Sequence, residues 1–378
     1  MRIPGWWGLR SGGSTPIGVD FDRDRVHWVQ LDRIKDSLTL RDACSIAHGG
    51  DLEALLYSKE DLKPLVREVL RKGHFRGRRI VTQAPSTDLR LMIVNYAVDA
   101  AKSVPEQIMN LARERMGDDL SDHVVDFVPI RTSGDQQGER SALVAVTLED
   151  PVVEFLDTLR GAGLDVVALE IVPVAICRLS AAMSRSPGEE YGSEIALVLR
   201  ISKATTELTL LSGRRLLLYR EIEFGSESMV EAVTKGLDCD AVVAAELLSS
   251  FGLAGHLQDI APTPEFPETL AELEDAGDIA RILQEILRPC LRTLVEQTHK
   301  AISYATFQTH GKSIAKIDLI ESASSCQGLD TLLAEMLQIP VEVFRPLSRV
   351  DGVDQIVSPD HQARLAVALG FALRGASR

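Results

Sequence analysis

Two stretches of the chain each contain three strand-like runs in succession, and this repeat constrains the fold more than any other feature. The runs are apolar or alternate between apolar and polar residues, and they fall at residues 16–20, 26–31 and 37–46 and again at residues 194–200, 205–211 and 214–222. The two stretches begin about 180 residues apart, and helical patterns follow both. We therefore expect a duplicated α/β domain.

The remaining elements complete two α/β halves. Apolar residues at helical spacing predict helices at residues 51–57, 60–70, 105–116, 151–160, 172–183, 226–235, 240–251, 279–309, 328–338 and 362–374. Short apolar runs predict further strands at residues 80–83, 89–94, 124–130, 141–147, 317–320 and 341–344. The elements between residues 88 and 167 read as a unit of their own, and the polar stretch 184–193 reads as a linker.

Composition and charge exclude several classes of protein. Of the 378 residues, 45% are hydrophobic and 25% are charged, which is typical of a soluble globular chain. Lys and Arg number 41 and Asp and Glu number 55, so the net charge is −14 and polyanions are repelled overall. We expect no nucleic-acid partner.

The cysteines and histidines show no spacing typical of a metal or redox site. The five cysteines lie far apart, and the eight histidines include no pair at ligand spacing. No apolar run approaches the ~20 residues that cross a bilayer, and the N-terminus lacks the apolar core of a signal peptide. We expect no metal, a reducing compartment and no export.

One region is strongly basic despite the negative total. Between residues 67 and 79 lie Arg67, Arg71, Lys72, His74, Arg76, Arg78 and Arg79. A solvated helix end is the simpler interpretation, since cations suit a helix C-terminus. Contact with anionic lipid or with an acidic partner is the alternative. At the N-terminus Trp6 and Trp7 are flanked by arginines, and a disordered leader or a packed first turn is the simpler interpretation. Contact with a membrane surface is the alternative.

Seven short motifs, in order along residues 16–374, resemble the type IV pilus assembly protein PilM family of the actin-like ATPase superfamily. They are Ile17-Gly18-Val19-Asp20, Ala84-Pro85-Ser86, the pair Val104-Pro105 with Asp126-Phe127, Glu223-Phe224-Gly225, Ala245-Glu246, Ile339-Pro340-Val341 and the stretch from Ala368 to Arg374. The first resembles a phosphate-binding hairpin, and the second a turn that leads into an inserted subdomain. The duplicated strands agree with this superfamily.

The resemblance implies the fold and the domain organisation. It implies an α/β, actin-like (ribonuclease H-like) fold with duplicated domains and an α/β insert in the first. On this basis residues 1–15 form a flexible leader, residues 16–187 the first domain with its insert at 88–167, and residues 190–357 the second domain. A C-terminal helix at residues 360–376 returns to the first domain.

The resemblance also implies a function. Proteins of this family lie on the cytoplasmic face of the bacterial inner membrane and bind the N-terminal cytoplasmic peptide of a membrane protein, PilN. We therefore expect a cytoplasmic scaffold, attached to the inner membrane through a PilN-like partner. The pilus motor ATPase and inner-membrane platform proteins are further expected partners, and the oligomeric state stays open.

The nucleotide-binding motifs depart from the family pattern. The resemblance places Asp20, Thr206, Gly225 and Glu246 in a nucleotide cleft between the domains. The resemblance implies that other residues replace the family's glycines, small hydroxyl residues, aspartate and lysines in this cleft, at Asp22, Arg23, Asp24, His27, Arg200, Ser202, Ser249, Glu321 and Ser322. We therefore expect a degenerate ATP site, no catalytic residues, no cofactor and no enzyme activity.

Two alternatives remain within the same fold. One is an active ATPase that binds ATP and magnesium; a sugar kinase is disfavoured because no second acidic residue can be named as the base. The other is the cytoplasmic platform component of a type II secretion system. The absence of a membrane span argues against the second alternative, because those proteins continue into the membrane.

Overall fold

The computed structural model describes most of the chain in two compact units. It describes residues 13–34, 37–49, 51–86, 88–97, 103–117, 119–130, 139–183, 195–212, 215–253, 276–321, 326–350, 357 and 362–375. The first unit comprises Met1–Ser193, Leu211–Leu217 and Arg345–Arg378, and the second comprises Glu194–Leu210 and Leu218–Phe344. The expected leader, apart from residues 13–15, and the expected linker lie outside the described residues.

The first unit is built on a mixed sheet whose strands run in the order β4-β3-β2-β5-β9, with the short β1 paired to the end of β3. Strands β2, β3 and β4 form an antiparallel meander, and β5 and β9 continue the sheet in parallel. The bounds are β1 Gly13–Ser14, β2 Ile17–Phe21, β3 Arg25–Ile34, β4 Ser37–Ala47, β5 Arg79–Gln83 and β9 Asp165–Glu170. The apolar patterns in the sequence did not predict β9.

A second sheet, most of which belongs to the second unit, repeats this arrangement, since its strands run in the order β12-β11-β10-β13-β14 and β13 lies parallel to both β10 and β14. Three consecutive strands are thus followed across each sheet by two parallel strands. The bounds are β10 Ile195–Ile201, β11 Thr206–Ser212, β12 Arg215–Ile222, β13 Ile317–Glu321 and β14 Val341–Val343. The matching strand orders confirm the duplication that the sequence predicts.

Helices cover both sheets, and side-chain caps fix several of their starts. Ser58 accepts a hydrogen bond from the N–H of Asp61, and Asp240 accepts from Val242 and Val243, which satisfies donors that a helix leaves open. The first unit has α1 Leu52–Tyr57, α2 Lys59–Lys72, α4 Glu149–Gly161, α5 Val172–Met183 and α12 Ala366–Ala372. The second has α6 Ser226–Leu237, α7 Ala241–Ser250, α9 Ala276–Gln308 and α10 Leu329–Leu337.

The insert has its own small sheet and its own core. Its strands β6 Arg90–Ala97, β7 His123–Ile130 and β8 Glu139–Leu148 run in the order β6-β8-β7, and α3 Val104–Met116 packs on them. Helix α4 instead packs through Phe155 and Leu159 into the core of the first unit. The expected segment 88–167 thus combines the insert proper with α4 and the start of β9.

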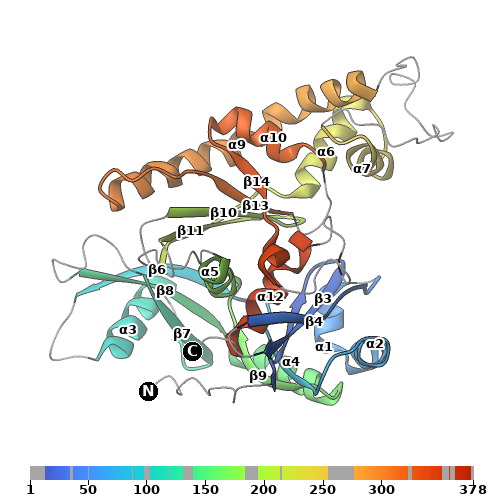
Figure 1. Cartoon of the computed structure of the whole chain (residues 1–378). Coiled ribbons are helices and arrows are strands. Elements are labelled where there is room, and N and C mark those ends of the chain that lie inside the picture. Colours follow the sequence, from blue (N-terminus) through green and yellow to red (C-terminus); the bar gives the residue numbers. More distant parts are fainter. Residues whose placement is uncertain are drawn as a thin grey trace. The chain divides into compact units, whose positions relative to one another are not determined.

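The C-terminal segment belongs to the first unit although it follows the second in the sequence. Short 3-10 helices at Ala363–Leu365 and Leu373–Gly375 flank α12, where the sequence predicts one continuous helix at residues 362–374. Another 3-10 helix lies at Pro346–Arg349. Figure 1 shows α12, in red, beside β3, and it also packs against β2 and α5. Every residue of α12 is buried, which explains why its sequence is apolar on all faces.

Candidate functional site

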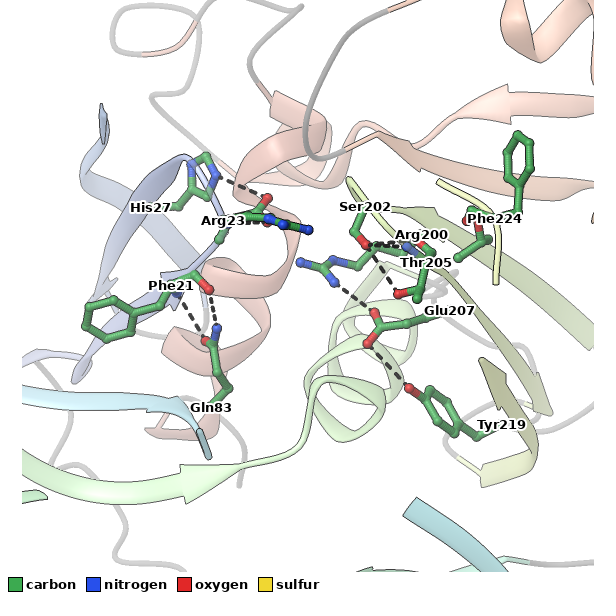
Figure 2. A network of polar contacts seen from close by, with 12 residues as sticks. Phe21, Arg23, His27, Gln83, Arg200, Ser202, Thr205, Glu207, Tyr219 and Phe224 are labelled. Carbon is green, nitrogen blue, oxygen red and sulfur yellow. Dashed lines mark hydrogen bonds and ion pairs between the residues drawn. The ribbon is translucent and has the colours of Figure 1, made fainter. Parts of the chain in front are cut away.

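The hairpin between β2 and β3 carries the first of the expected nucleotide-binding elements. Asp20 lies on β2 opposite His27 of β3, and both side chains are buried. His27 contacts the hydroxyl of Ser45 at 2.6 Å through Nδ1, and its Nε2 lies 3.9 Å from the Asp22 carboxylate. Figure 2 shows His27 and Arg23 at this hairpin. His27 is thus a packed residue of β3.

Asp22 closes the turn of this hairpin on itself. Its carboxylate accepts a hydrogen bond from the N–H of Arg23 at 2.8 Å, and its own N–H donates to the carbonyl of Arg25 at 2.9 Å. Phosphate-binding loops use the backbone N–H groups of a turn as donors to the phosphate, which requires these groups to be free. Here the Arg23 N–H already donates to the Asp22 carboxylate, which also places a negative charge beside it.

Gln83 fixes the end of β2 and is a residue that sequence reasoning missed. Its amide accepts from the N–H of Phe21 at 3.2 Å and donates to the carbonyl of Phe21 at 2.7 Å (Figure 2). The parallel pairing of β2 with β5 runs from Ile17 to Val19, so the Gln83 side chain extends this ladder by one step. A glutamine at the last position of a strand gave no indication of this role.

The hairpin between β10 and β11 carries the second element, and an ion pair occupies it. The N–H of Ser202 donates to the carbonyl of Thr205 at 2.9 Å, which makes a two-residue turn and places Arg200 opposite Glu207. Arg200 donates to Glu207 at 2.9 Å, and both side chains are largely buried (Figure 2). Counting outward from this turn would have found Glu207 in the sequence.

Tyr219 on β12 extends this pair, because its hydroxyl lies 3.4 Å from Glu207. Burial raises the pKa of Tyr219, and the negative charge of Glu207 raises it further. Burial and Glu207 likewise raise the pKa of Glu221. Tyr219 therefore stays protonated as a hydrogen-bond donor, and Glu207 is held between it and Arg200.

Thr206 and Gly225 lie together beside the same turn. The buried hydroxyl of Thr206 donates to the carbonyl of Phe224 at 2.7 Å. A Cβ atom on Gly225 would lie 2.3 Å from the carbonyl oxygen of Lys203, so only glycine fits this approach of two backbones. The Thr206 hydrogen bond and the close approach at Gly225 thus hold the segment that follows β12 against this turn.

The remaining expected site residues are spread over both units. Asp20 belongs to the first unit, whereas Glu246 is exposed on α7 of the second, as is Ser249. Glu321 ends β13, and Ser322 lies outside the described residues. The structure thus brings Thr206 and Gly225 together, and the grouping of all four residues in one cleft stays a prediction.

A cavity of about 220 Å³ lies between the insert and the core of the first unit. On the insert side it is lined by β7 and β8, including Phe127 and Ala145. On the core side it is lined by the end of β9, the start of α5 and the C-terminal Arg374. Its walls come from five segments far apart in the sequence, so no single motif could have indicated it.

A buried carboxylate with two arginines forms one end of this cavity. The Glu170 side chain is 4% exposed and receives two parallel hydrogen bonds from Arg178, at 2.7 and 2.8 Å. Arg374 also donates to Glu170, and Arg178 donates to the carbonyl of Gly370 at 2.7 Å. These contacts connect β9, α5 and the C-terminal helix, and Arg374 leaves 42% of its side chain exposed.

Other reactive chemistry is not assembled in the part of the chain that the structure describes. No group of three metal-ligating side chains occurs among those residues. Burial raises the pKa of Cys44 and of Cys177 to about 12, so both thiols stay protonated and unreactive near neutral pH. No helix in the described ranges is long and apolar enough to cross a membrane.

Comparison with known proteins places these observations in a family. The sequence pattern of the family described as type IV pilus assembly protein PilM matches residues 18–248. A solved structure titled PilM-PilN type IV pilus biogenesis complex aligns with a TM-score of 0.70 at 22% identity, over 96% of this chain and 99% of that chain.

A second solved structure has the same fold at a greater distance. The ethanolamine utilization protein EutJ from Carboxydothermus hydrogenoformans aligns with a TM-score of 0.52 at 12% identity, over 96% of this chain and 89% of that chain. No curated protein matches the sequence. The fold is the actin-like fold.

Proposed function

Because the chain belongs to the type IV pilus assembly protein PilM family, we propose that it is a cytoplasmic scaffold at the inner membrane that binds the N-terminal peptide of a PilN-like membrane protein. Its general function is type IV pilus assembly. In our proposal the peptide attaches the scaffold to the membrane, and nucleotide has no part in binding. The family match favours this function over a role in type II secretion.

The cavity between the insert and the first-unit core carries the proposal. Its volume of about 220 Å³ is below the roughly 300–1,000 Å³ of pockets for whole drug-sized ligands. It suits a few side chains of an extended segment better than a complete small molecule. The residues Val124, Phe127, Leu143 and Val174 provide apolar walls, so the peptide is expected to be partly apolar.

The adjacent strand β7 supplies backbone groups for such a peptide. β7 is the edge strand of the insert sheet, because it pairs with β8 on one side and ends the strand order β6-β8-β7. An edge strand presents a row of backbone donors and acceptors to which an extended peptide can add. Asp126 and Arg374 place one charge of each sign in the lining, and these charges fix the direction of the peptide.

We expect the N-terminal cytoplasmic peptide of the PilN-like protein encoded with this chain to bind in the cavity. A ligand at about 100 times its dissociation constant stabilises the folded state by ~2.7 kcal/mol, so calorimetric heat and a higher melting temperature should appear together. Ala145→Phe fills the cavity from the central strand β8 and should reduce affinity at least about tenfold, since ~1.4 kcal/mol is lost with a few apolar contacts.

Ala97→Phe is the matched control, because Ala97 is exposed on β6 of the same sheet and does not line the cavity. It should bind the peptide as the unchanged chain does. If the unchanged chain gives neither heat nor stabilisation, the scaffold proposal fails. If both variants bind equally well, the peptide binds elsewhere.

We propose that the protein functions without nucleotide because of contacts in the β2–β3 and β10–β11 hairpins. The Arg23 N–H is occupied by the Asp22 carboxylate, the Thr206 hydroxyl by the Phe224 carbonyl and the Arg200 guanidinium by Glu207. The family pattern needs such groups for phosphate, so the residues present do not fit ATP. The runner-up, an active ATPase, keeps in its favour the actin-like fold and the retained Asp20, Thr206 and Gly225.

We expect titration of magnesium-ATP to give a dissociation constant above about 1 mM, equivalent to less than ~4.1 kcal/mol of binding free energy. Asp22→Gly removes the carboxylate and frees the Arg23 N–H, so this variant should bind ATP more tightly than the unchanged chain. Low-micromolar binding, or nucleotide retained through purification, would restore the ATPase to first place.

A further inference from the structure

The basic segment 67–79 lies on the surface of the first unit, and the structure describes all of it. It contains six Lys and Arg residues and one acidic residue, Glu68, which is paired with Lys72 at 2.6 Å. Its cations and His74 are all exposed: Arg67, Arg71, Lys72, His74, Arg76, Arg78 and Arg79. We call residues 71–79 the basic loop. Its charge is opposite in sign to the net charge of −14 of the whole chain.

A helix terminus does not account for this cluster. Cations interact favourably with the last turn of a helix, and Arg71 and Lys72 occupy the last turn of α2. The helix ends at Lys72, however, and Arg76, Arg78 and Arg79 follow it. The effect of a helix dipole falls off within one turn, so it gives no reason for these three arginines.

Carboxylates near the basic loop neutralise little of its charge. Two of them are paired with other cations, Glu68 with Lys72 and Asp32 with Arg41. Among the described residues, no carboxylate forms a salt bridge within 4.0 Å of three arginines of the loop: Arg71, Arg76 and Arg79. Asp165 lies opposite the last of these in the pairing of β5 with β9 and is itself exposed. The surface therefore carries positive charge that the neighbouring residues leave for a partner.

Buried polar groups hold the backbone of the basic loop at alternate residues. The Gln30 side chain is 1% exposed, accepts from the N–H of Arg76 at 2.7 Å and donates to the carbonyl of Arg76 at 2.9 Å. The buried Asp42 accepts from the N–H of His74, and the carbonyl of Arg78 accepts from the backbone of β9 at 2.8 Å. The cations thus extend from a fixed backbone, so that binding requires little ordering of the loop.

The basic loop offers charge without an exposed apolar side chain. Phe75 is its one aromatic residue, and it packs inward against the buried Trp28, with ring centroids 6.4 Å apart. Stable attachment to a membrane takes an apolar contribution in addition to a basic one. Binding of single-stranded nucleic acid likewise uses aromatic rings on which bases stack. The described surface supplies neither.

We propose that the basic loop binds an acidic segment of a partner protein. Four of its five Lys and Arg residues are arginines, whose planar guanidinium groups match carboxylates through two parallel hydrogen bonds. A short acidic segment contacts the loop alone. A membrane or a DNA duplex extends beyond it and meets the repulsion of a chain with a net charge of −14.

This surface is separate from the peptide cavity, because the cavity lining shares no residue with the basic loop. The partner that it binds is therefore a second protein segment, which can be bound at the same time as the peptide. Exposed charges chiefly accelerate association and make it dependent on salt. We expect the acidic segment to bind rapidly and to dissociate at high ionic strength.

Titration of the purified full chain into fluorescently labelled poly-L-glutamate, followed by anisotropy, tests the proposal. We expect binding that weakens strongly between about 0.1 M and about 1 M salt, where the screening length falls from ~10 to ~3 Å. The triple variant Arg71→Glu, Arg76→Glu, Arg79→Glu should reduce affinity about a hundredfold. Each lost ion pair removes up to about a fivefold factor, and each new carboxylate repels the probe. The neutral triple variant with Gln at these positions should fall between the two.

The control changes net charge equally at exposed positions of the second unit, with Arg292→Glu, Lys300→Glu and Lys312→Glu. It should keep most of the affinity, and melting curves should show which variants fold. Vesicles containing phosphatidylglycerol and a DNA duplex should each bind more weakly than poly-L-glutamate at the same salt.

Three results would overturn the proposal: no binding of poly-L-glutamate, equal loss of affinity in the two reversed-charge triple variants, or tighter binding of vesicles or DNA. Self-association of the unchanged chain that the triple variant of the basic loop abolishes would also overturn it, since the surface would then bind a second copy of the chain.

Discussion

Replacing Gly18 with alanine is expected to loosen the C-terminal helix from the first unit and to lower the free energy of unfolding by about 3 kcal/mol or more. A Cβ atom at this position of β2 would lie 1.8 Å from the carbonyl oxygen of Ala368 and 2.6 Å from the nitrogen of Ala372. Both atoms belong to the backbone of α12, so no side chain can rotate to make room. Urea denaturation measures the loss.

Gly117→Ala is the control for this substitution. Gly117 ends α3 with a φ of 72°, and a Cβ atom added there would meet no other atom within 4 Å, so the cost is backbone strain of about 1–2 kcal/mol. Limited proteolysis should cleave the C-terminal segment faster in the Gly18 variant only. Equal stability of the two variants would show that α12 does not pack closely on β2.

The duplicated strands could be predicted because their neighbours along the sequence are also their neighbours in the sheet. Each meander follows chain order, and the first turn, at residues 22–24, is polar, whereas the second consists of only two residues, Lys203 and Ala204. β9 escaped prediction because it is a parallel strand between two helices, with a short apolar run that periodicity cannot separate from helix. The short motifs nevertheless identified the PilM family correctly, as the match to residues 18–248 confirms.

The departures from the nucleotide-binding pattern were visible in the sequence, but most of the contacts that surround them were not. Arg200 reads in the sequence as a replacement for the family's aspartate, and the structure pairs it with Glu207 on the next strand. Glu170 had no sequence signature at all, because its arginine partners come from α5 and from the C-terminus, up to 204 residues away. Such contacts depend on the tertiary fold.

Removing the charge of Glu170 is expected to destabilise the first unit by about 3–5 kcal/mol, because Glu170→Gln leaves the largely buried Arg178 without its counter-charge. Glu335→Gln is the matched control, since Glu335 also binds an arginine through both oxygens, at 2.7 and 2.9 Å from Arg288, but 59% of its side chain is exposed. That surface pair should contribute at most about 1 kcal/mol. Urea denaturation of both variants measures the difference, and equal losses would contradict a structural role for the buried cluster. Because Glu170 and Arg374 also line the cavity, Glu170→Gln should weaken peptide binding while Glu335→Gln leaves it unchanged.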